Sequence, residues 1–185
     1  MKFLLHACCA PCGAFVFEEL KKQFEVSCYF YNPNIWPSSE YEKRRNECKR
    51  YCERNKIPFV EERYEPEIWD NKVKGLESEP EGGKRCEKCF ELRLTKTTEY
   101  AKNNNFDFFA TTLTISPHKD SNTINKIGRE VGEKLDIAFF EADWKKNDGY
   151  KKSCEISKKK GFYRQNYCGC RYSLSKNNLA KNDTP

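Results

Sequence analysis

Long hydrophobic runs are missing from this 185-residue sequence. No stretch approaches the roughly 20 apolar residues that a membrane-spanning helix needs, so we expect no membrane association. The apolar run after Lys2 is short and is interrupted by His6, and cleavage there would remove a thiol-rich segment. That run is therefore not expected to act as a secretory signal, and together with the many cysteines this leads us to expect a cytoplasmic location.

Glycine-rich phosphate loops are missing as well, both the P-loop type and the dinucleotide-binding type. Nucleotide hydrolysis and hydride transfer from NAD therefore have no motif in this chain. The sequence also shows no internal repeat, so a repeat architecture is not expected.

Cysteine, in contrast, is abundant, with eleven residues in a chain too long to be a disulfide scaffold. In a reducing compartment, clustered cysteines usually indicate metal or redox chemistry. Seven of the eleven fall into three groups that we treat as candidate site residues: Cys8, Cys9 and Cys12; Cys86 and Cys89; and Cys168 and Cys170.

Positive charge is concentrated near the C-terminus. Residues 145–185 hold 11 Lys and Arg against 3 Asp and Glu, a net charge of +8, whereas residues 1–144 hold 23 against 25. This asymmetry indicates a polyanionic partner such as nucleic acid, with a solvated basic face as the alternative explanation.

Short β-branched and aromatic runs alternate with segments of helical periodicity, which predicts an α/β fold with a doubly wound parallel sheet. We expect a single domain over residues 1–175 with a helical, basic C-terminal part, followed by a polar tail, 176–185, that is disordered. The expected strands are 2–5, 25–31, 57–62, 106–111 and 137–141, and the expected helices are 14–20, 39–55, 65–73, 85–103, 121–135 and 150–160. A capping box of Ser39 and Glu42 is expected to begin the second helix.

A Rossmann-like strand order would make the first and fourth strands neighbours at the switch point of the sheet. The thiol loop, Cys8 to Cys12, and the polar loop, Thr112 to Lys119, would then flank one crevice. This places His118 and Lys119 where a substrate would bind.

The Cys86-x-x-Cys89 pair is expected in the first turn of a helix, where both sulfurs point the same way. The free N–H groups there, with Arg85 adjacent, would favour thiolates. With two or three sulfurs from the thiol loop, the pair would form a four-thiolate site for Zn²⁺ or a [4Fe–4S] cluster. Neighbouring Cys8 and Cys9 side chains should diverge, which argues against a zinc knuckle and favours iron–sulfur. Inert buried thiols are the alternative.

The remaining cysteines fall into two classes. Cys168 and Cys170 could close only a strained, labile disulfide, so they indicate a two-electron relay or a clamp for a second metal with Cys12 as a third ligand, unless they simply pack in the core. Four others are assigned to packing: Cys28, Cys48, Cys52 and Cys154. His6 is expected to be a hydrogen-bonded core histidine rather than a ligand.

Four segments together resemble the QueH-type epoxyqueuosine reductases: HACCAPC (6–12), RCEKCFELRL (85–94), TTLTISPHK (111–119) and YCGCRYS (167–173). The resemblance extends from Lys2 to about Ser173. It implies a HUP-like variant of the Rossmann fold, in which the thiol loop occupies the place of a phosphate loop. It also implies the last step of queuosine synthesis, the deoxygenation of epoxyqueuosine to queuosine in the wobble position of tRNA.

The resemblance further implies roles for the candidate cysteines. Cys8, Cys9, Cys86 and Cys89 match ligands of a [4Fe–4S] cluster, and Cys168 and Cys170 match a pair treated as redox-active. A second metal ion, iron or zinc, is implied beside the cluster. Cys12 stands where a relative has Asp, so the ligand set of that second metal stays open.

Deoxygenation needs two electrons, and a [4Fe–4S] cluster passes one at a time, so we expect a second centre and an external electron donor. A metal beside the cluster would act on the epoxide oxygen as a Lewis acid. We expect basic residues to hold tRNA phosphates and a tyrosine to stack on a base, so affinity for tRNA should fall with salt. The candidates are Lys145, Lys146, Lys151, Lys152, Lys158 to Lys160, Tyr163, Tyr167 and Tyr172.

Three other functions fit parts of the pattern. A PP-loop-like tRNA-modifying enzyme shares the fold class but needs the glycine loop that is missing here. A zinc-stabilised nucleic-acid-binding module without catalysis would be colourless. A thiol oxidoreductase that uses only Cys168 and Cys170 would keep its activity in the Cys86→Ala variant.

Overall fold

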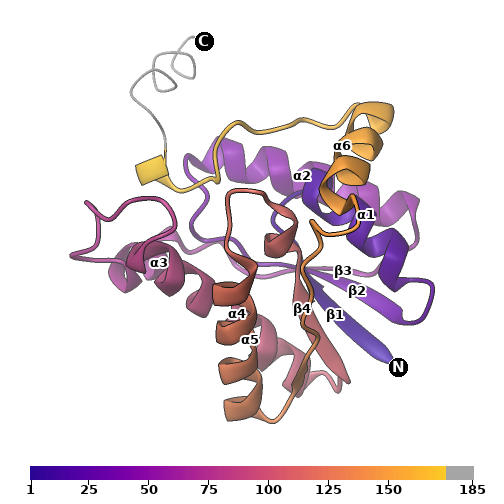
Figure 1. Ribbon diagram of the computed structural model, residues 1–185, viewed down its shortest axis with the longest axis horizontal. Helices are drawn as coiled ribbons and strands as arrows, with labels where there is room; N and C mark the ends of the chain where they lie inside the picture. Colours follow the sequence, from indigo (N-terminus) through magenta and orange to yellow (C-terminus); the bar gives the residue numbers. More distant parts are fainter. Residues whose placement is uncertain (174–185) are drawn as a thin grey trace.

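The computed structural model describes residues 1–173 (Figure 1). One five-stranded sheet, with every pairing parallel, has the order β3-β2-β1-β4-β5. The predicted Rossmann-like, doubly wound α/β fold is therefore confirmed, while the expected tail, 176–185, lies outside the described residues. The strands are β1 (Lys2–His6), β2 (Glu25–Phe30), β3 (Phe59–Glu61), β4 (Phe108–Thr111) and β5 (Ala138–Phe139).

Helices cover both faces of the sheet (Figure 1). On one face lie α1 (Ala10–Leu20), α2 (Ser38–Arg54) and α6 (Gly149–Lys160). On the other lie α4 (Lys84–Asn103) and α5 (Ser121–Leu135), with α3 (Pro66–Lys72) packed against α4. None of the described helices has the length and apolar character required to cross a membrane.

The central strand β1 contributes side chains to the hydrophobic cores on both faces of the sheet. Phe3 and Leu5 belong to the apolar cluster under α1, whereas Leu4 belongs to the cluster that contains Leu94 of α4. All four side chains are fully buried. A strand covered on both faces needs a continuous apolar run, which explains why Phe3-Leu4-Leu5 shows no alternation.

β1 and β4 are neighbours at the switch point, as predicted. Their pairing runs from Phe3 opposite Phe108 to His6 opposite Thr111. Both strands therefore end at the same level, and the segments that follow them face one another at the carboxyl edge of the sheet.

The thiol loop is shorter than predicted because α1 begins at Ala10 rather than at Ala14. Pro11 fits the first turn of a helix, where its missing N–H has no partner to lose. Cys12 therefore lies within the helix. Gly13 is helical too, and a Cβ there would lie 2.8 Å from the Phe17 ring, so this glycine makes room for an aromatic side chain.

Other element boundaries also differ from the predictions. The capping box was wrong: α2 begins at Ser38 after Pro37, with no side-chain cap, and Ser39 lies inside the helix. The segment after β4 is not a polar loop throughout, because its first four residues form a buried 3₁₀ turn, η1 (Thr112–Ile115). A second 3₁₀ turn, η2 (Arg171–Ser173), was not predicted.

The N-cap of α5 gives a stability test. The Asp120 carboxylate accepts hydrogen bonds from the backbone N–H groups of Asn122 and Thr123, at 3.2 and 2.9 Å. We expect Asp120→Ala to lower the free energy of unfolding by about 1 kcal/mol, measured by urea denaturation. Ser39→Ala, at an exposed position without a capping bond, should change it by less than about 0.5 kcal/mol. Equal losses in the two variants would contradict the assignment.

Candidate metal and active site

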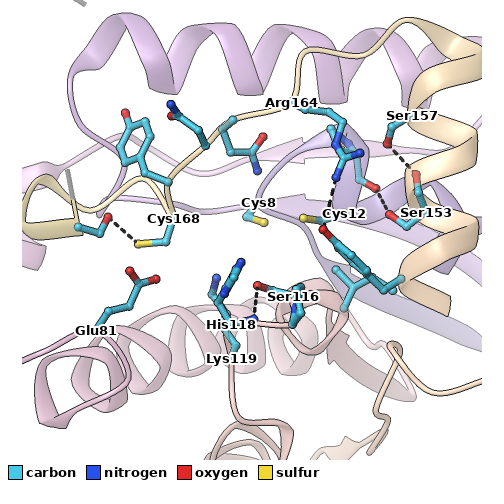
Figure 2. Close-up of a pocket in the computed structure, with 18 residues that line it drawn as sticks. Cys8, Cys12, Glu81, Ser116, His118, Lys119, Ser153, Ser157, Arg164 and Cys168 are labelled. Carbon is cyan, nitrogen blue, oxygen red and sulfur yellow. Dashed lines mark hydrogen bonds between the residues drawn. The ribbon is translucent and has the colours of Figure 1, made fainter. Parts of the chain in front are cut away.

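A cavity of about 360 Å³ opens at the carboxyl ends of β1 and β4 (Figure 2). Its walls come from the start of α1, the segment after η1, the first turns of α6 and the C-terminal segment, which we define as residues 161–173. The thiols of Cys8, Cys12 and Cys168 lie across the cavity from Glu81, His118 and Lys119. The predicted crevice between the thiol loop and the segment after β4 is therefore present.

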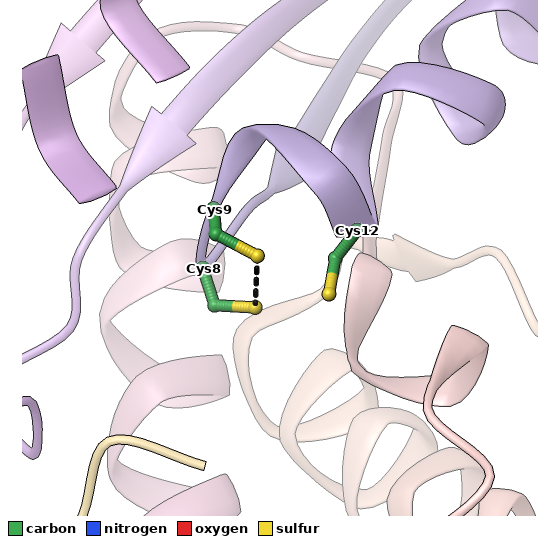
Figure 3. Close-up of side chains that lie close together, drawn as sticks. All are labelled: Cys8, Cys9 and Cys12. Atoms are coloured by element: carbon green, nitrogen blue, oxygen red, sulfur yellow. Dashed lines mark hydrogen bonds between the residues drawn. The ribbon is translucent and has the colours of Figure 1, made fainter. Parts of the chain in front are cut away.

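The three thiols of the first group converge (Figure 3). The sulfurs of Cys8, Cys9 and Cys12 lie within 4.8 Å of one another, and those of Cys8 and Cys9 are 3.8 Å apart. The expectation that the neighbouring side chains Cys8 and Cys9 diverge was wrong. The chain passes from strand to helix at Cys9, and this change of direction brings both sulfurs to the same side.

Hydrogen bonding gives these three thiols different pKa values. The bonds from Cys12 and Cys9, aided by the positive charges of Arg93 and Lys119, hold the pKa of Cys8 well below its usual value. The same bonding to Cys8 raises the pKa of Cys12 well above the usual range. Cys8, which lines the cavity, is therefore the thiol of this group that most readily becomes a thiolate.

The second thiol group reaches the same place from α4. Cys86 lines a smaller adjoining cavity together with Cys8 and Cys168. Cys89 packs with Cys168 and Cys170 in an apolar cluster around Trp69. The structure thus gathers thiols of all three predicted groups around one position.

Some of these sulfurs lie close enough together to bind one metal ion, and others do not. Among the described residues, the only trios of possible ligands whose atoms lie within 4.8 Å of one another are Cys8, Cys9 and Cys12, and Cys28, Cys48 and Cys52. Cys86 and Cys89 belong to neither trio. A single tetrahedral zinc ion, with Zn–S bonds of about 2.3 Å, needs its four sulfurs about 3.8 Å apart. The present spacing across the two segments is wider than that.

A hydrogen-bonded chain connects the two segments. Arg93, one turn after Cys89 on α4, is buried and donates to the Asn32 side-chain oxygen at 2.5 Å. The Asn32 amide in turn donates to the Ala7 carbonyl at 3.0 Å, directly before Cys8. The Arg93 charge therefore lies between the thiols of the two segments and is fixed there by the chain leading into the thiol loop.

At the start of α4, burial opposes the expected formation of thiolates. Burial raises the pKa of Cys86 and of Cys89 above their usual value. Arg85, expected to favour the thiolates, instead donates to the carbonyls of Leu76, Glu77 and Glu79 in the preceding loop. A metal ion bound by this pair would favour its deprotonation.

Cys168 and Cys170 are free thiols in the structure rather than a disulfide. A hydrogen bond from the Cys170 thiol, together with the charge of Lys119, lowers the pKa of Cys168 well below its usual value. The same bond raises the pKa of Cys170. Cys168 lines both cavities, while Cys170 is buried behind it.

His6 is a core residue, as predicted. One ring nitrogen donates to the Tyr31 carbonyl at 3.1 Å, and the other lies 2.8 Å from the Thr111 hydroxyl. Burial, with the nearby charge of Arg93, lowers the pKa of His6 to about 3. The ring is therefore neutral, and both of its nitrogens are occupied.

Three of the cysteines assigned to packing form a cluster of their own. Cys28, Cys48 and Cys52 are fully buried, and they belong to the apolar cluster on the α1 face of the sheet. Their surroundings are aromatic and aliphatic, so packing accounts for them. Cys154 lies on α6, half-buried, with its sulfur 3.2 Å from Arg164.

The candidate tRNA contacts are only partly free. Lys145 donates to the Lys119 carbonyl at 2.7 Å inside the protein, and the hydroxyls of Tyr163 and Tyr167 donate to Glu40 and to the Trp36 carbonyl. The lysines of α6 are exposed: Lys151, Lys152, Lys158, Lys159 and Lys160.

Sequence reasoning missed several residues around the thiols. Arg93 follows Cys89 at a helical i, i+4 spacing, a signal that would have placed it on the same face. Glu81 and Arg164 enter the cavity from irregular segments, for which periodicity gives no signal.

The donor set fits a thiolate-bound metal centre. Cys8, Cys86 and Cys168 offer sulfurs to one space, and Arg93 and Lys119 supply positive charge beside them. Soft thiolate ligands select zinc or iron–sulfur clusters over hard cations.

The chain is similar to a family of known proteins. The family model described as epoxyqueuosine reductase QueH matches residues 3–176. The chain is 44% identical to the epoxyqueuosine reductase QueH of Histophilus somni, over 96% of this chain and 74% of the relative. It is 43% identical to that of Haemophilus influenzae, over 99% and 76%, and 38% identical to that of Thermotoga maritima, over 92% and 89%. The chain therefore belongs to the QueH family of epoxyqueuosine reductases.

Proposed function

We propose that this protein is an oxidoreductase that removes the epoxide oxygen of epoxyqueuosine in the wobble position of tRNA and leaves queuosine. The observation that carries the proposal is the meeting of Cys8, Cys86 and Cys168 around one space in a QueH-family chain. Family membership does not favour the zinc-stabilised binding module or the PP-loop-like enzyme.

A [4Fe–4S] cluster held by Cys8, Cys9, Cys86 and Cys89 is the cofactor that we propose. The spacing supports a polynuclear centre, because sulfurs from the two segments are not mutually close enough for one tetrahedral ion. When bound, such a cluster would supply electrons one at a time. The conversion consumes two electrons and two protons and releases water, so an external electron donor is required.

Cys168, Cys170 and Cys12 are the proposed second redox or metal-binding group. Cys168 and Cys12 line the larger cavity beside Cys8, whereas Cys170 gives its thiol hydrogen bond to Cys168. A substrate held in this cavity would therefore meet Cys168 as the more acidic thiol of the pair. The group is a metal clamp if Cys12 binds a second metal ion together with Cys168 and Cys170, and it is an electron relay if Cys168 and Cys170 form a disulfide instead.

Lys119 and His118 are placed to receive the departing oxygen. Both line the two cavities on the wall opposite the thiols (Figure 2). Cleavage of the epoxide C–O bond leaves negative charge on oxygen, which a fixed ammonium group stabilises. We propose that Lys119 provides that charge and orients the epoxide toward Cys8 and Cys168.

The tRNA would approach along α6. Its exposed lysines lie on the element that supplies Tyr150 and Ser153 to the cavity wall. Tyr150 is 39% exposed and Tyr172 is 38% exposed, so these two rings are better placed than Tyr163 to stack on a splayed base. With tRNA as substrate, we propose a cytoplasmic location.

Activity separates this function from its rivals. We expect Cys8→Ala and Cys168→Ala each to reduce the conversion of epoxyqueuosine in tRNA at least about 100-fold, because each removes a thiol from the reacting space. Nucleosides released from the tRNA would be quantified by mass spectrometry under oxygen-free conditions. Cys154→Ala is the matched control and should keep nearly full activity. Conversion by the Cys8→Ala protein would refute the proposed site.

Salt dependence tests the tRNA surface. Replacing Lys158, Lys159 and Lys160 by Ala should weaken tRNA binding and reduce the slope of log affinity against log salt by about one for each phosphate that is no longer bound. Filter binding over a series of salt concentrations would measure both. Lys126→Ala on α5, on the opposite face of the sheet, should leave the slope unchanged. Binding by the native protein that ignores salt would contradict a phosphate-binding face.

A further inference from the structure

Arg44 is an arginine buried within α2. Its side chain is 1% exposed, and its Nε donates to Glu40 at 2.6 Å, in a pair whose carboxylate side chain is only 8% exposed. Removing both charges from water is costly, and an ion pair alone rarely offsets that cost. The remaining contacts of the guanidinium show what else it does.

The two terminal nitrogens of Arg44 hold the C-terminal segment. One donates to the Cys168 carbonyl at 3.1 Å, and the other donates to the Tyr167 carbonyl at 3.3 Å. The guanidinium also lies 5.1 Å from the centre of the Tyr167 ring. A single side chain thus connects α2 to Tyr167 and Cys168. We call these contacts the junction between α2 and the C-terminal segment.

Neighbouring contacts reinforce the same junction. The second oxygen of Glu40 accepts from the Tyr163 hydroxyl at 3.0 Å, and the Trp36 N–H donates to the Gly169 carbonyl at 2.8 Å. Gly169 has a φ of +110°, and a Cβ there would lie 3.1 Å from Arg44. The backbone between the two thiols is therefore pressed against the guanidinium.

This junction matters because no regular element carries Cys168. Residues 162–170 form neither helix nor strand, so backbone ladders do not fix the position of the thiol. The contacts just described act in their place. They come from α2 and from Trp36 just before it, and α2 contributes none of the residues lining the two cavities.

We propose that Arg44 is a positioning residue for the reaction: it fixes the Cys168 thiol on the same side of the cavity as Cys8 by holding the Tyr167 and Cys168 carbonyls against α2. The proposal rests on the function proposed above. A lysine cannot replace Arg44, because one ammonium group does not present the planar fork that reaches two carbonyls and a carboxylate together.

The test compares Arg44→Lys with Arg45→Lys in the full chain prepared without oxygen. Arg45 is the adjacent residue, and its guanidinium pairs with Glu61 at 3.3 Å on the partly exposed side of α2. For Arg44→Lys we expect kcat to fall at least about 10-fold, since small misplacements of reacting groups have large effects on rate. KM for tRNA and the iron and sulfide content should stay within about twofold of the native values. Arg45→Lys should match the native protein in all of these.

A readout independent of turnover completes the test. The rate at which iodoacetamide alkylates Cys168, measured by peptide mass spectrometry against Cys154 in the same chain, should change at least threefold in Arg44→Lys and not in Arg45→Lys. If the native protein converts no epoxyqueuosine, the proposed function fails, while this alkylation ratio still decides whether Arg44 fixes the thiol.

Two results would overturn the proposal. The first is native kcat and native alkylation in Arg44→Lys. The second is loss of iron and activity together in a protein of native helicity, which would indicate a role in holding the cofactor rather than in positioning Cys168. If Arg44→Lys does not fold, Tyr163→Phe, which removes only the hydroxyl bond to Glu40, must show the same selective fall in kcat. Native behaviour of that variant would then count against positioning through this junction.

Discussion

The parallel pairing of β1 with β4 is the constraint on which the rest of the site depends. It ends both strands at His6 and Thr111, and the hydrogen bonds of a neutral, buried His6 to Thr111 and to the Tyr31 carbonyl fasten three neighbouring segments at that level. Cys8 follows two residues later and meets Lys119 across the opening. A shift in this register would move the thiol loop away from the segment that faces it.

Positive charge close to the thiols is the second common feature of the site. Arg93 links α4 to the residue before Cys8 through Asn32, Arg44 links α2 to Cys168, and Lys119 borders both cavities. Thiolates buried without such charges would be costly, and cations buried without thiolates or carbonyls would be equally so. The cations and the thiols therefore stabilise one another, and the same contacts fix the geometry of three segments that are distant in sequence.

Much of this arrangement was predictable from sequence because it follows from periodicity. The alternation of apolar runs and helical segments predicted the sheet and its switch point, and the spacing of Cys86 and Cys89 predicted their place on α4. Contacts between distant side chains were not predictable in this way. Arg85 was expected beside the thiols but binds loop carbonyls, whereas Arg44 drew no attention because only the folded chain places Cys168 against it. The convergence of the Cys8 and Cys9 sulfurs was not predicted, because the chain turns from strand to helix at Cys9, whereas the helix was expected to begin only at Ala14.

The central claim is that sulfurs from the thiol loop and from α4 hold iron at one position. Anomalous diffraction at the iron absorption edge, from crystals grown without oxygen, tests it most directly. The account predicts a strong iron peak between the sulfurs of Cys8 and Cys86. An iron-free protein, or a metal bound only by Cys8, Cys9 and Cys12 with Cys86 and Cys89 left unbound, would contradict it.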